Sequence, residues 1–483
     1  MKKMKQQKSA RFKALWGGRF SKELNSLAKR FSYSLSTDYL LLGTDIKTSM
    51  AHALMLGKVG LISEKESRAL VKGLWQVLAT LKKVDMDQLS SSVEDIHTLI
   101  QETLEKKVGK LARKLHTARS RNDLVATSTR IYVKEKSVSL LEKICRLQSA
   151  LVSLAEKHES VLIPGYTHLQ RAQIVLFAHY LLAYVEMLAR DSARISDLRS
   201  QTNECPLGAC ALAGTSLPID RMYVAKLLGF KQPSANSMDA VSDRDFVIEI
   251  VSAIAILMMH LSRISEDLIL WNSSEFSFVT LADEFATGSS LMPHKKNPDM
   301  LELVKGRTGR AYGNLVSVLT LMKGLPLAYN RDMQEDKKPL FDSMALAEDA
   351  LEVLTGVVST LQINRKMCEL AIKDSFLYAT DLLEYLVKRK VAFRDAHEVV
   401  GKLVQHAIDS HLNLSGLTLE TFQKFSNRFG KDVFDLFDPN RSVSSKMSVG
   451  STNPQLVKGE ILRWKKALRD QFSKLKKAAV HHA

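Results

Sequence analysis

The sequence predicts an all-α protein built around a bundle of long helices. Three observations support this fold class. Glycine (22 residues), proline (10) and aromatic residues (7%) are too scarce for the closely spaced turns of an all-β chain. Between about residues 117 and 362, five long stretches have the apolar spacing of helices. Loops containing proline and glycine interrupt these stretches.

The 483 residues exceed what one core of roughly 250–300 residues accommodates. We therefore expect two or three domains, or one long-helix body with smaller ends, and the sequence pattern divides the chain into three helical parts. Residues 1–116 alternate short helical segments with breakers such as Gly17-Gly18, residues 117–362 form the five-helix bundle, and residues 363–483 return to shorter helices. Neither an internal repeat nor a strand pattern is expected.

The five long stretches differ in how much of their surface is apolar. In residues 130–158, leucine and isoleucine recur every three or four positions, which predicts one apolar helix face. Residues 172–200 continue in a similar way. Residues 245–271 are apolar nearly all round, so this helix is expected to be central and buried. Residues 299–322 and 339–361 supply the other two helices.

Most of the formal net charge of +17 lies at the two ends of the chain. Residues 1–13 carry six Lys or Arg and no acid, and residues 461–483 carry seven and one Asp. We interpret both segments as basic, solvated tails. The alternative, nucleic-acid binding, is not expected, because no zinc-finger spacing or aromatic–arginine groove accompanies the charge.

The sequence predicts a cytoplasmic protein. Its most apolar run, residues 250–261, is about twelve residues long, shorter than the roughly 18–20 that span a membrane. The basic N-terminus is not followed by the apolar run of a signal peptide. The four cysteines lack CxxC spacing, so we expect small buried side chains rather than disulfides or a metal site.

The loop GSSLMPHKKNPD, residues 288–299, has the composition of a ligand site. Gly288 permits unusual backbone angles, and Lys295 and Asn297 offer donors. A helix pattern follows, with acids such as Glu302 in its first turn, where they interact favourably with the helix dipole. A loop with hydroxyls, donors and a helix N-terminus is suited to bind a carboxylate. The alternative is a serine-rich surface loop.

Two further loops place polar side chains at expected helix starts. In HTARSRND, residues 116–123, Asp123 can cap the next helix while Asn122 faces a ligand. In PGYTHLQR, residues 164–171, a Thr-His pair follows a Pro-Gly turn and precedes a long helix. A histidine at such a position is usually a cap or core residue, and it becomes an acid/base candidate if a carboxylate tunes it.

Two acidic segments complete the set of candidate loops. They are SVEDIHT, residues 92–98, and YNRDMQEDK, residues 329–337, and both can also be plain solvated turns. HExxH, Walker and GxGxxG motifs are absent from the sequence. These parts predict acid/base chemistry on an anionic small molecule, without a metal or cofactor.

The loop motifs resemble those of a known enzyme family. GSSLMPHKKNPD is similar to the signature of the fumarase/aspartase superfamily, whose members release fumarate from a succinyl group. HTARSRND, GYTHLQRAQ, PLGACALAGTSLPIDR, SDRDF and YNRDMQEDK resemble the argininosuccinate lyases and their delta-crystallin relatives. The likeness runs from Trp16 to about Val457. It implies a three-domain, all-α subunit and a homotetramer with a core of twenty helices and active sites shared between subunits.

The resemblance implies reversible β-elimination of argininosuccinate to arginine and fumarate, the last step of arginine biosynthesis. A base removes a proton beside a carboxylate, and the guanidinium nitrogen leaves with help from an acid. Ser289 and His168 match the two catalytic groups, and Glu302 matches the carboxylate that tunes His168. Which of the two is the base stays open. A serine needs backbone donors and exclusion of water to act as one.

The remaining positions that match the family hold or support the substrate. The matches to substrate contacts are Ser34, Asn122, Thr167, Lys295, Asn297, Tyr329, Gln334 and Lys337. Arg121 and Arg244 are expected to pair with carboxylates of the substrate. Asp95 and His97 match residues near the site whose role is less direct.

Three positions depart from the family pattern. Leu124 and His294 stand where glutamine is usual, and Ser451 stands where glycine is common. We expect the first two to affect substrate affinity and not catalysis. Sister enzymes such as fumarase, aspartase and adenylosuccinate lyase lack RSRND followed by YNRDMQEDK. A catalytically silent, crystallin-like relative is the other alternative, and the presence of Ser289 and His168 argues against it.

Overall fold

The computed structural model describes residues 24–85 and 92–480. These residues are mostly helical, and the strands among them form two-stranded pairs. The chain divides into two compact units. The first unit comprises residues 1–136, 198–249 and 316–341, and the second comprises residues 137–197, 250–315 and 342–483.

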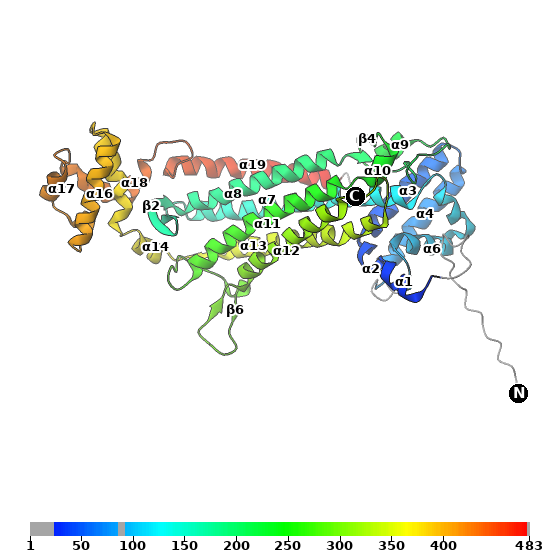
Figure 1. Ribbon diagram of the computed structural model, residues 1–483, viewed down its shortest axis with the longest axis horizontal. Helices are drawn as coiled ribbons and strands as arrows, with labels where there is room; N and C mark the ends of the chain where they lie inside the picture. The colour runs from blue at the N-terminus through cyan, green and yellow to red at the C-terminus, as the bar shows by residue number, and fades with distance from the viewer. Residues whose placement is uncertain (1–23, 86–91, 481–483) are drawn as a thin grey trace. The chain divides into compact units, whose positions relative to one another are not determined.

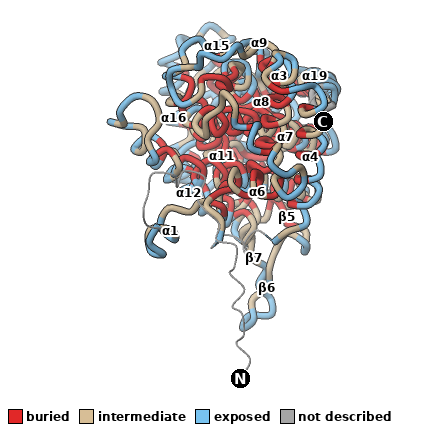
Figure 2. The backbone as a smooth tube through the Cα atoms, turned by 90° about the vertical axis from the view of Figure 1, so that its right-hand side faces the viewer, coloured by how far each residue is buried: buried red, intermediate tan, exposed pale blue. Residues whose placement is uncertain are grey.

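The five predicted long helices are present. They are α7 (Arg121–Lys157), α8 (Phe177–Gln201), α11 (Asp245–Asn272), α12 (Asp299–Met322) and α13 (Lys337–Thr360). Within the second unit they run side by side as a bundle (Figure 1). Figure 2 shows that α11 is buried, as its all-round apolar pattern predicts, with Ile250, Ile254 and Leu257 fully enclosed.

Helix α11 is longer than the apolar run that the sequence suggested. Its 28 residues make it long and apolar enough to cross a membrane, by length and composition alone. The expectation that this segment is too short to span a membrane is therefore wrong. However, 61% of its most apolar window is buried inside the protein. Such burial is typical of the core helix of a bundle, where neighbouring helices cover every face.

The first unit packs shorter helices around α3. Its elements are α1 (Ser26–Ser32), α2 (Leu35–Asp38), η2 (Tyr39–Leu41), α3 (Leu42–Lys58), α4 (Glu64–Leu81), α6 (Ile96–Val108), η3 (Gly109–His116), β3 (Glu204–Cys205), α9 (Arg221–Leu227), β4 (Gln232–Pro233), α10 (Ser237–Ser242) and η5 (Arg331–Asp336). Helix α3 packs against α4 and α6. A capping box between Ser63 and Glu66 starts α4.

The second unit adds hairpins and C-terminal helices to the bundle. Its further elements are β1 (Leu162–Thr167), β2 (Gln170–Leu176), β5 (Val279–Thr280), η4 (Asp283–Phe285), β6 (Thr287–Gly288), β7 (Lys296–Asn297), β8 (Gln362–Ile363), α14 (Arg365–Ala371), η6 (Ser375–Tyr378), α15 (Ala379–Lys388), α16 (Phe393–Asp409), η7 (Leu414–Gly416), α17 (Leu419–Phe425), η8 (Lys431–Phe437), α18 (Pro439–Ser444) and α19 (Pro454–Val480). Helices α15 to α17 enclose a core around Phe422 and Phe429.

The hairpin β1–β2 corrects two expectations. Residues 172–176 were expected to begin a helix, but they are a strand, and α8 starts at Phe177. In this strand Ile174 and Leu176 are buried while Gln173 is exposed, which is the period of two that a half-buried strand requires. The Pro-Gly pair likewise forms an irregularity inside β1 rather than a turn.

The C-terminal basic segment is also not a solvated tail. Helix α19 continues to Val480, and Ile461, Trp464 and Leu468 on its inner face are buried. Trp464 Nε1 donates to Glu186 of α8 at 3.0 Å. The expectation for residues 461–480 is therefore wrong, because their apolar residues recur at helical spacing between the lysines. The N-terminal basic segment, residues 1–13, lies outside the described residues.

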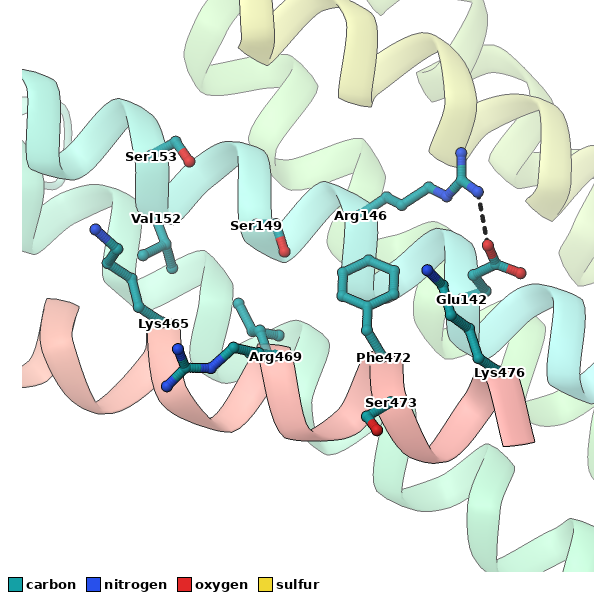
Figure 3. Close-up of a pocket in the computed structure, with 11 residues that line it drawn as sticks. Glu142, Arg146, Ser149, Val152, Ser153, Lys465, Arg469, Phe472, Ser473 and Lys476 are labelled. Atoms are coloured by element: carbon teal, nitrogen blue, oxygen red, sulfur yellow. Dashed lines mark hydrogen bonds and ion pairs between the residues drawn. The ribbon is translucent and has the colours of Figure 1, made fainter. Parts of the chain in front are cut away.

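A groove of about 840 Å³ lies between α7 and α19. Figure 3 shows Phe472 of α19 pointing towards α7, near Arg146 and Lys476. The residues that line this groove include none of the residues predicted to act on substrate. The predicted active site therefore has to be sought in the loops.

Trp464→Ala is expected to lower the free energy of unfolding by about 3–5 kcal/mol, because it leaves a cavity under α19 and removes the hydrogen bond to Glu186. Urea unfolding at a fixed protein concentration measures the change. Lys466→Ala on the exposed face of the same helix is the control, with an expected change within about 0.5 kcal/mol. Equal stability of Trp464→Ala and wild type would contradict the packing of α19.

Candidate active site

In the first unit, two carboxylates fix the start of α6. Asp95 caps the helix and accepts hydrogen bonds from Thr98 N and Thr98 Oγ1, both at 2.7 Å. Asp38 accepts from Ile96 N at 3.1 Å and from Ser34 Oγ at 2.6 Å. The predicted residues Ser34 and Asp95 therefore lie on adjoining segments, joined through Asp38.

Arg121 extends this cluster from the first residue of α7. Its guanidinium pairs with Asp95 at 2.7 Å and donates to Thr98 Oγ1 at 3.1 Å. The side chain is 35% exposed, so part of the guanidinium can reach a ligand. A planar, permanently charged donor held in this way is suited to bind a carboxylate.

His97 lies behind Arg121, with its side chain only 8% exposed and Nδ1 bonded to the carboxylate of Asp45. Burial alone would lower its pKa, but Asp45, Asp95 and Asp38 outweigh burial and raise it. Burial would likewise raise the pKa of Asp95, but His97 and Arg121 lower it. Asp95 and His97 therefore both favour their charged forms, which suits the indirect role predicted for them.

The segment 329–337 packs against the same cluster. Gln334 Nε2 donates to Ser32 O at 3.2 Å, and Arg331 donates to Ser32 O at 2.9 Å. Arg331 also pairs with Glu94 at 3.2 Å. Burial raises the pKa of Tyr329. Tyr329 and Gln334 thus belong to the group of predicted residues that the first unit brings together.

Arg244 and Lys337 do not lie at an open surface, although both were predicted to touch substrate. Arg244 is 1% exposed and donates from Nε to Asp336 at 2.5 Å. Lys337 is 4% exposed and pairs with Asp336 at 2.6 Å, and burial lowers its pKa. Arg244 therefore pairs with a carboxylate of the protein itself, Asp336. Asp336 thus binds Arg244 to the end of the segment 329–337, to which Lys337 itself belongs.

Asn122 and Asp123 join the start of α7 to the loop Pro206–Leu212. Asn122 Nδ2 donates to Ala211 O at 3.0 Å. Asp123 is fully buried and accepts from the backbone N–H groups of Ser120, Gly208 and Cys210. Burial raises the pKa of Asp123 to about 6, although these donors oppose the shift. The capping role predicted for Asp123 is confirmed, and the loop contact is additional.

In the second unit, His168 lies at the tip of the hairpin β1–β2. Thr167 pairs with Gln170, so the loop consists of His168 and Leu169, whose φ angles are 54° and 57°. Thr167 and His168 are exposed, and the imidazole makes no hydrogen bond within the described residues. The tight turn therefore leaves the imidazole exposed at the surface of the chain.

Ser289 follows β6 in a second hairpin, β6–β7, which projects from the bundle (Figure 1). Its Oγ accepts from Leu291 N at 3.3 Å and from Met292 N at 3.0 Å. Lys295 is exposed in the same hairpin, and Asn297 lies on β7 opposite Thr287. Two backbone donors on one hydroxyl oxygen would stabilise negative charge there.

The predicted catalytic residues do not converge within one chain. Glu302 is exposed on the first turn of α12, and no hydrogen bond or ion pair within the described residues joins it to His168 or Ser289. Figure 1 shows the two hairpins that carry His168 and Ser289 at separate places in the second unit. Two of the departures from the family pattern differ in exposure: Leu124 is buried and His294 is exposed.

Strained backbone marks the loops that carry predicted residues. In the described part of the chain, eight non-glycine residues have positive φ angles. Five of them lie in or beside these loops, namely Ala118, His168, Leu169, Cys210 and Ala328, and Ser277, Lys390 and His411 lie elsewhere. Such conformations cost of order 1 kcal/mol each in non-glycine residues and collect at functional sites. Nothing in the sequence indicates them, because none of these residues is glycine or asparagine.

Comparison with known proteins agrees with the motifs. Residues 18–313 match the Lyase family, and residues 376–444 match the argininosuccinate lyase C-terminal family. The argininosuccinate lyase of Pelobacter propionicus is 48% identical over 452 residues, which is 94% of this chain and 98% of the relative. That of Bacillus licheniformis is 48% identical over 458 residues, 95% and 100% of the two chains.

The chain belongs to the argininosuccinate lyase family. It is therefore a carbon–nitrogen lyase, and the predicted family and enzyme class are confirmed. Solved structures show the same helical fold. An EDDS lyase in complex with formate has a TM-score of 0.83 at 28% identity, covering 96% of this chain and 93% of that one. A fumarate lyase (delta crystallin) from Brucella melitensis has a TM-score of 0.71 at 20% identity, covering 87% and 95%.

Proposed function

We propose that this chain catalyses the reversible cleavage of argininosuccinate to arginine and fumarate in the cytoplasm, as the last step of arginine biosynthesis. The observation that carries this function is 48% identity to argininosuccinate lyases over 94% of the chain. The predicted acid/base and donor residues, including Ser289, His168, Lys295 and Asn297, are all present. No metal or cofactor is invoked.

In the proposed mechanism, Ser289 acts as its alkoxide, with its own hydroxyl proton already lost to solvent, and takes a proton from the carbon beside a substrate carboxylate. The C–H electron pair moves into that carboxylate, next to Lys295 and Asn297, and then forms the C=C bond of fumarate as the C–N bond breaks. His168 gives a proton to the leaving guanidinium nitrogen, and Glu302 tunes that histidine. The two backbone donors on Ser289 Oγ support its assignment as the base.

We propose that the predicted contact residues hold the substrate. Arg121 pairs with a substrate carboxylate, and further hydrogen bonds come from Ser34, Asn122, Thr167, Tyr329 and Gln334. Arg244 and Lys337 act indirectly, since both are buried and paired with Asp336 of the segment 329–337. Asp95 and His97 orient Arg121, which rests on Asp95.

We further propose a three-domain subunit that forms a homotetramer, with twenty helices at its core and active sites completed by neighbouring copies. Two observations support the assembly. His168, Ser289 and Glu302 are not bonded to one another within a chain. Helix α12 also exposes an apolar row at helical spacing, Tyr312, Val316 and Leu319, which another copy would cover.

The purified protein is expected to release fumarate when argininosuccinate is added, measured as the rise in ultraviolet absorbance of fumarate. Malate, aspartate and adenylosuccinate serve as control substrates, because the sister lyases act on them. Turnover of argininosuccinate alone would support the proposal. Turnover of a control substrate would indicate a sister enzyme, and no turnover at all would indicate a silent, crystallin-like relative.

A further inference from the structure

Asp123 uses both carboxylate oxygens to join two separate loops. Oδ1 accepts from Ser120 N at 3.0 Å, just before α7. Oδ2 accepts from Gly208 N and Cys210 N, both at 2.9 Å, in the loop Pro206–Leu212. An amide in the same place would offer one acceptor oxygen, and its NH₂ group would face at least one of these N–H donors.

The loop Pro206–Leu212 needs outside support to keep its backbone conformation. Gly208 has a φ of +91°, and a Cβ atom there would lie 2.7 Å from Arg221 Cγ. Cys210 has a φ of 55°, which a residue with a Cβ atom rarely adopts. Arg221 binds the carbonyl of Leu207 at 3.2 Å, and Cys210 Sγ contacts Ala118 O at 3.3 Å. The buried carboxylate of Asp123 adds two charge-assisted bonds to the backbone N–H groups of this loop.

The side chain of Asn122 depends on this loop. Its Nδ2 donates a hydrogen bond at 3.0 Å to the carbonyl oxygen of Ala211, which is the residue after Cys210. Oδ1 of Asn122 accepts no hydrogen bond from the described residues. The position of the loop therefore sets the plane of the amide and the direction in which Oδ1 points.

We infer that Asp123 is a positioning residue, which aims the amide of Asn122 at the substrate by holding the loop Pro206–Leu212 against the start of α7. This inference rests on the proposed role of Asn122 as a substrate contact. Asp123 is buried and does not itself touch substrate. Its contribution reaches the reaction through Asn122, so the effect of losing it should depend on whether Asn122 is present.

A double-mutant cycle with Asp123→Asn and Asn122→Ala tests the inference on the full-length enzyme. Asp123→Asn is expected to raise KM for argininosuccinate about 10- to 100-fold with kcat changed less than about threefold, the pattern of a lost binding contact. In the Asn122→Ala background, the same change should alter KM less than about twofold, because the contact is already gone. Thermal unfolding of every variant is recorded alongside.

The control is Asp191→Asn, which removes another buried carboxylate, one bonded to His260 and Arg194 in the second unit. It is expected to lower stability while KM stays within about twofold. If Asp123→Asn does not fold, Gly208→Ala replaces it, since it displaces the same loop and leaves the carboxylate in place.

The outcomes separate this inference from the proposed function. If Asn122→Ala alone leaves KM unchanged, the substrate role of Asn122 is wrong, and the inference fails with it. Asn122→Ala can raise KM while Asp123→Asn raises KM by the same factor in the Asn122→Ala background as in wild type. Asp123 then acts independently of Asn122, and only the inference is overturned. A loss of kcat with unchanged KM in Asp123→Asn would overturn it as well.

Discussion

Ser289→Ala is expected to lower kcat about 10²- to 10⁴-fold while argininosuccinate still binds, because the substitution removes one catalytic proton-transfer group. The hydroxyl oxygen already accepts two backbone hydrogen bonds, which prepare this position for negative charge. Steady-state kinetics of fumarate release give kcat. Equilibrium binding of argininosuccinate to the inactive variant gives the affinity separately.

Ser290→Ala is the matched control for this prediction. Ser290 is the next residue of the same loop, is exposed, and is not among the predicted site residues. Its kcat is expected to stay within about threefold of wild type. A Ser289→Ala enzyme with near-normal kcat would remove Ser289 from the mechanism, whatever the control shows.

Two inactive variants are expected to restore activity together. If His168 and Ser289 of one site come from different copies, mixed tetramers of His168→Asn and Ser289→Ala contain some sites that lack neither group. Coexpression should therefore recover a substantial fraction of wild-type activity that neither variant has alone. Differently tagged copies, purified through both tags, ensure that the assemblies measured are mixed.

The control replaces one partner with the double variant His168→Asn/Ser289→Ala. When it is coexpressed with Ser289→Ala, every site lacks Ser289, and no recovery is expected. Failure of the first pair to recover in assemblies proven to be mixed would place both groups of a site on one copy. That result would contradict shared active sites and leave the family assignment untouched.

The long helices could be predicted because their apolar residues repeat over many turns. Short elements lack that redundancy. In β2, the alternation of Ile174 and Leu176 covers only a few residues and merges with the helix that follows, so the start of α8 was placed too early. In α19, the abundance of lysine concealed an inner face formed by Ile461, Trp464 and Leu468.

The candidate site was predictable as a set of loops but not as a set of contacts. The motifs identify Arg244 and Lys337, but they do not indicate that Asp336 binds both cations inside the first unit. The pair between Arg244 and Asp336 joins segments some ninety residues apart, and no local pattern encodes it. The same holds for Asp45 behind His97 and for the loop bound by Asp123.

The motif around His168 depends on the rest of the fold for its backbone conformation. His168 and Leu169 both hold left-handed backbone angles, which two-residue hairpins require and which glycine or asparagine would adopt more readily. The strands behind the turn are anchored by Ile174, which packs with Ile372, Tyr378 and Val443 of the C-terminal helices. A peptide of sequence GYTHLQR, or the same letters grafted onto another hairpin, would relax to a different turn. The motif is thus a reliable mark of ancestry and a poor building block for enzyme design.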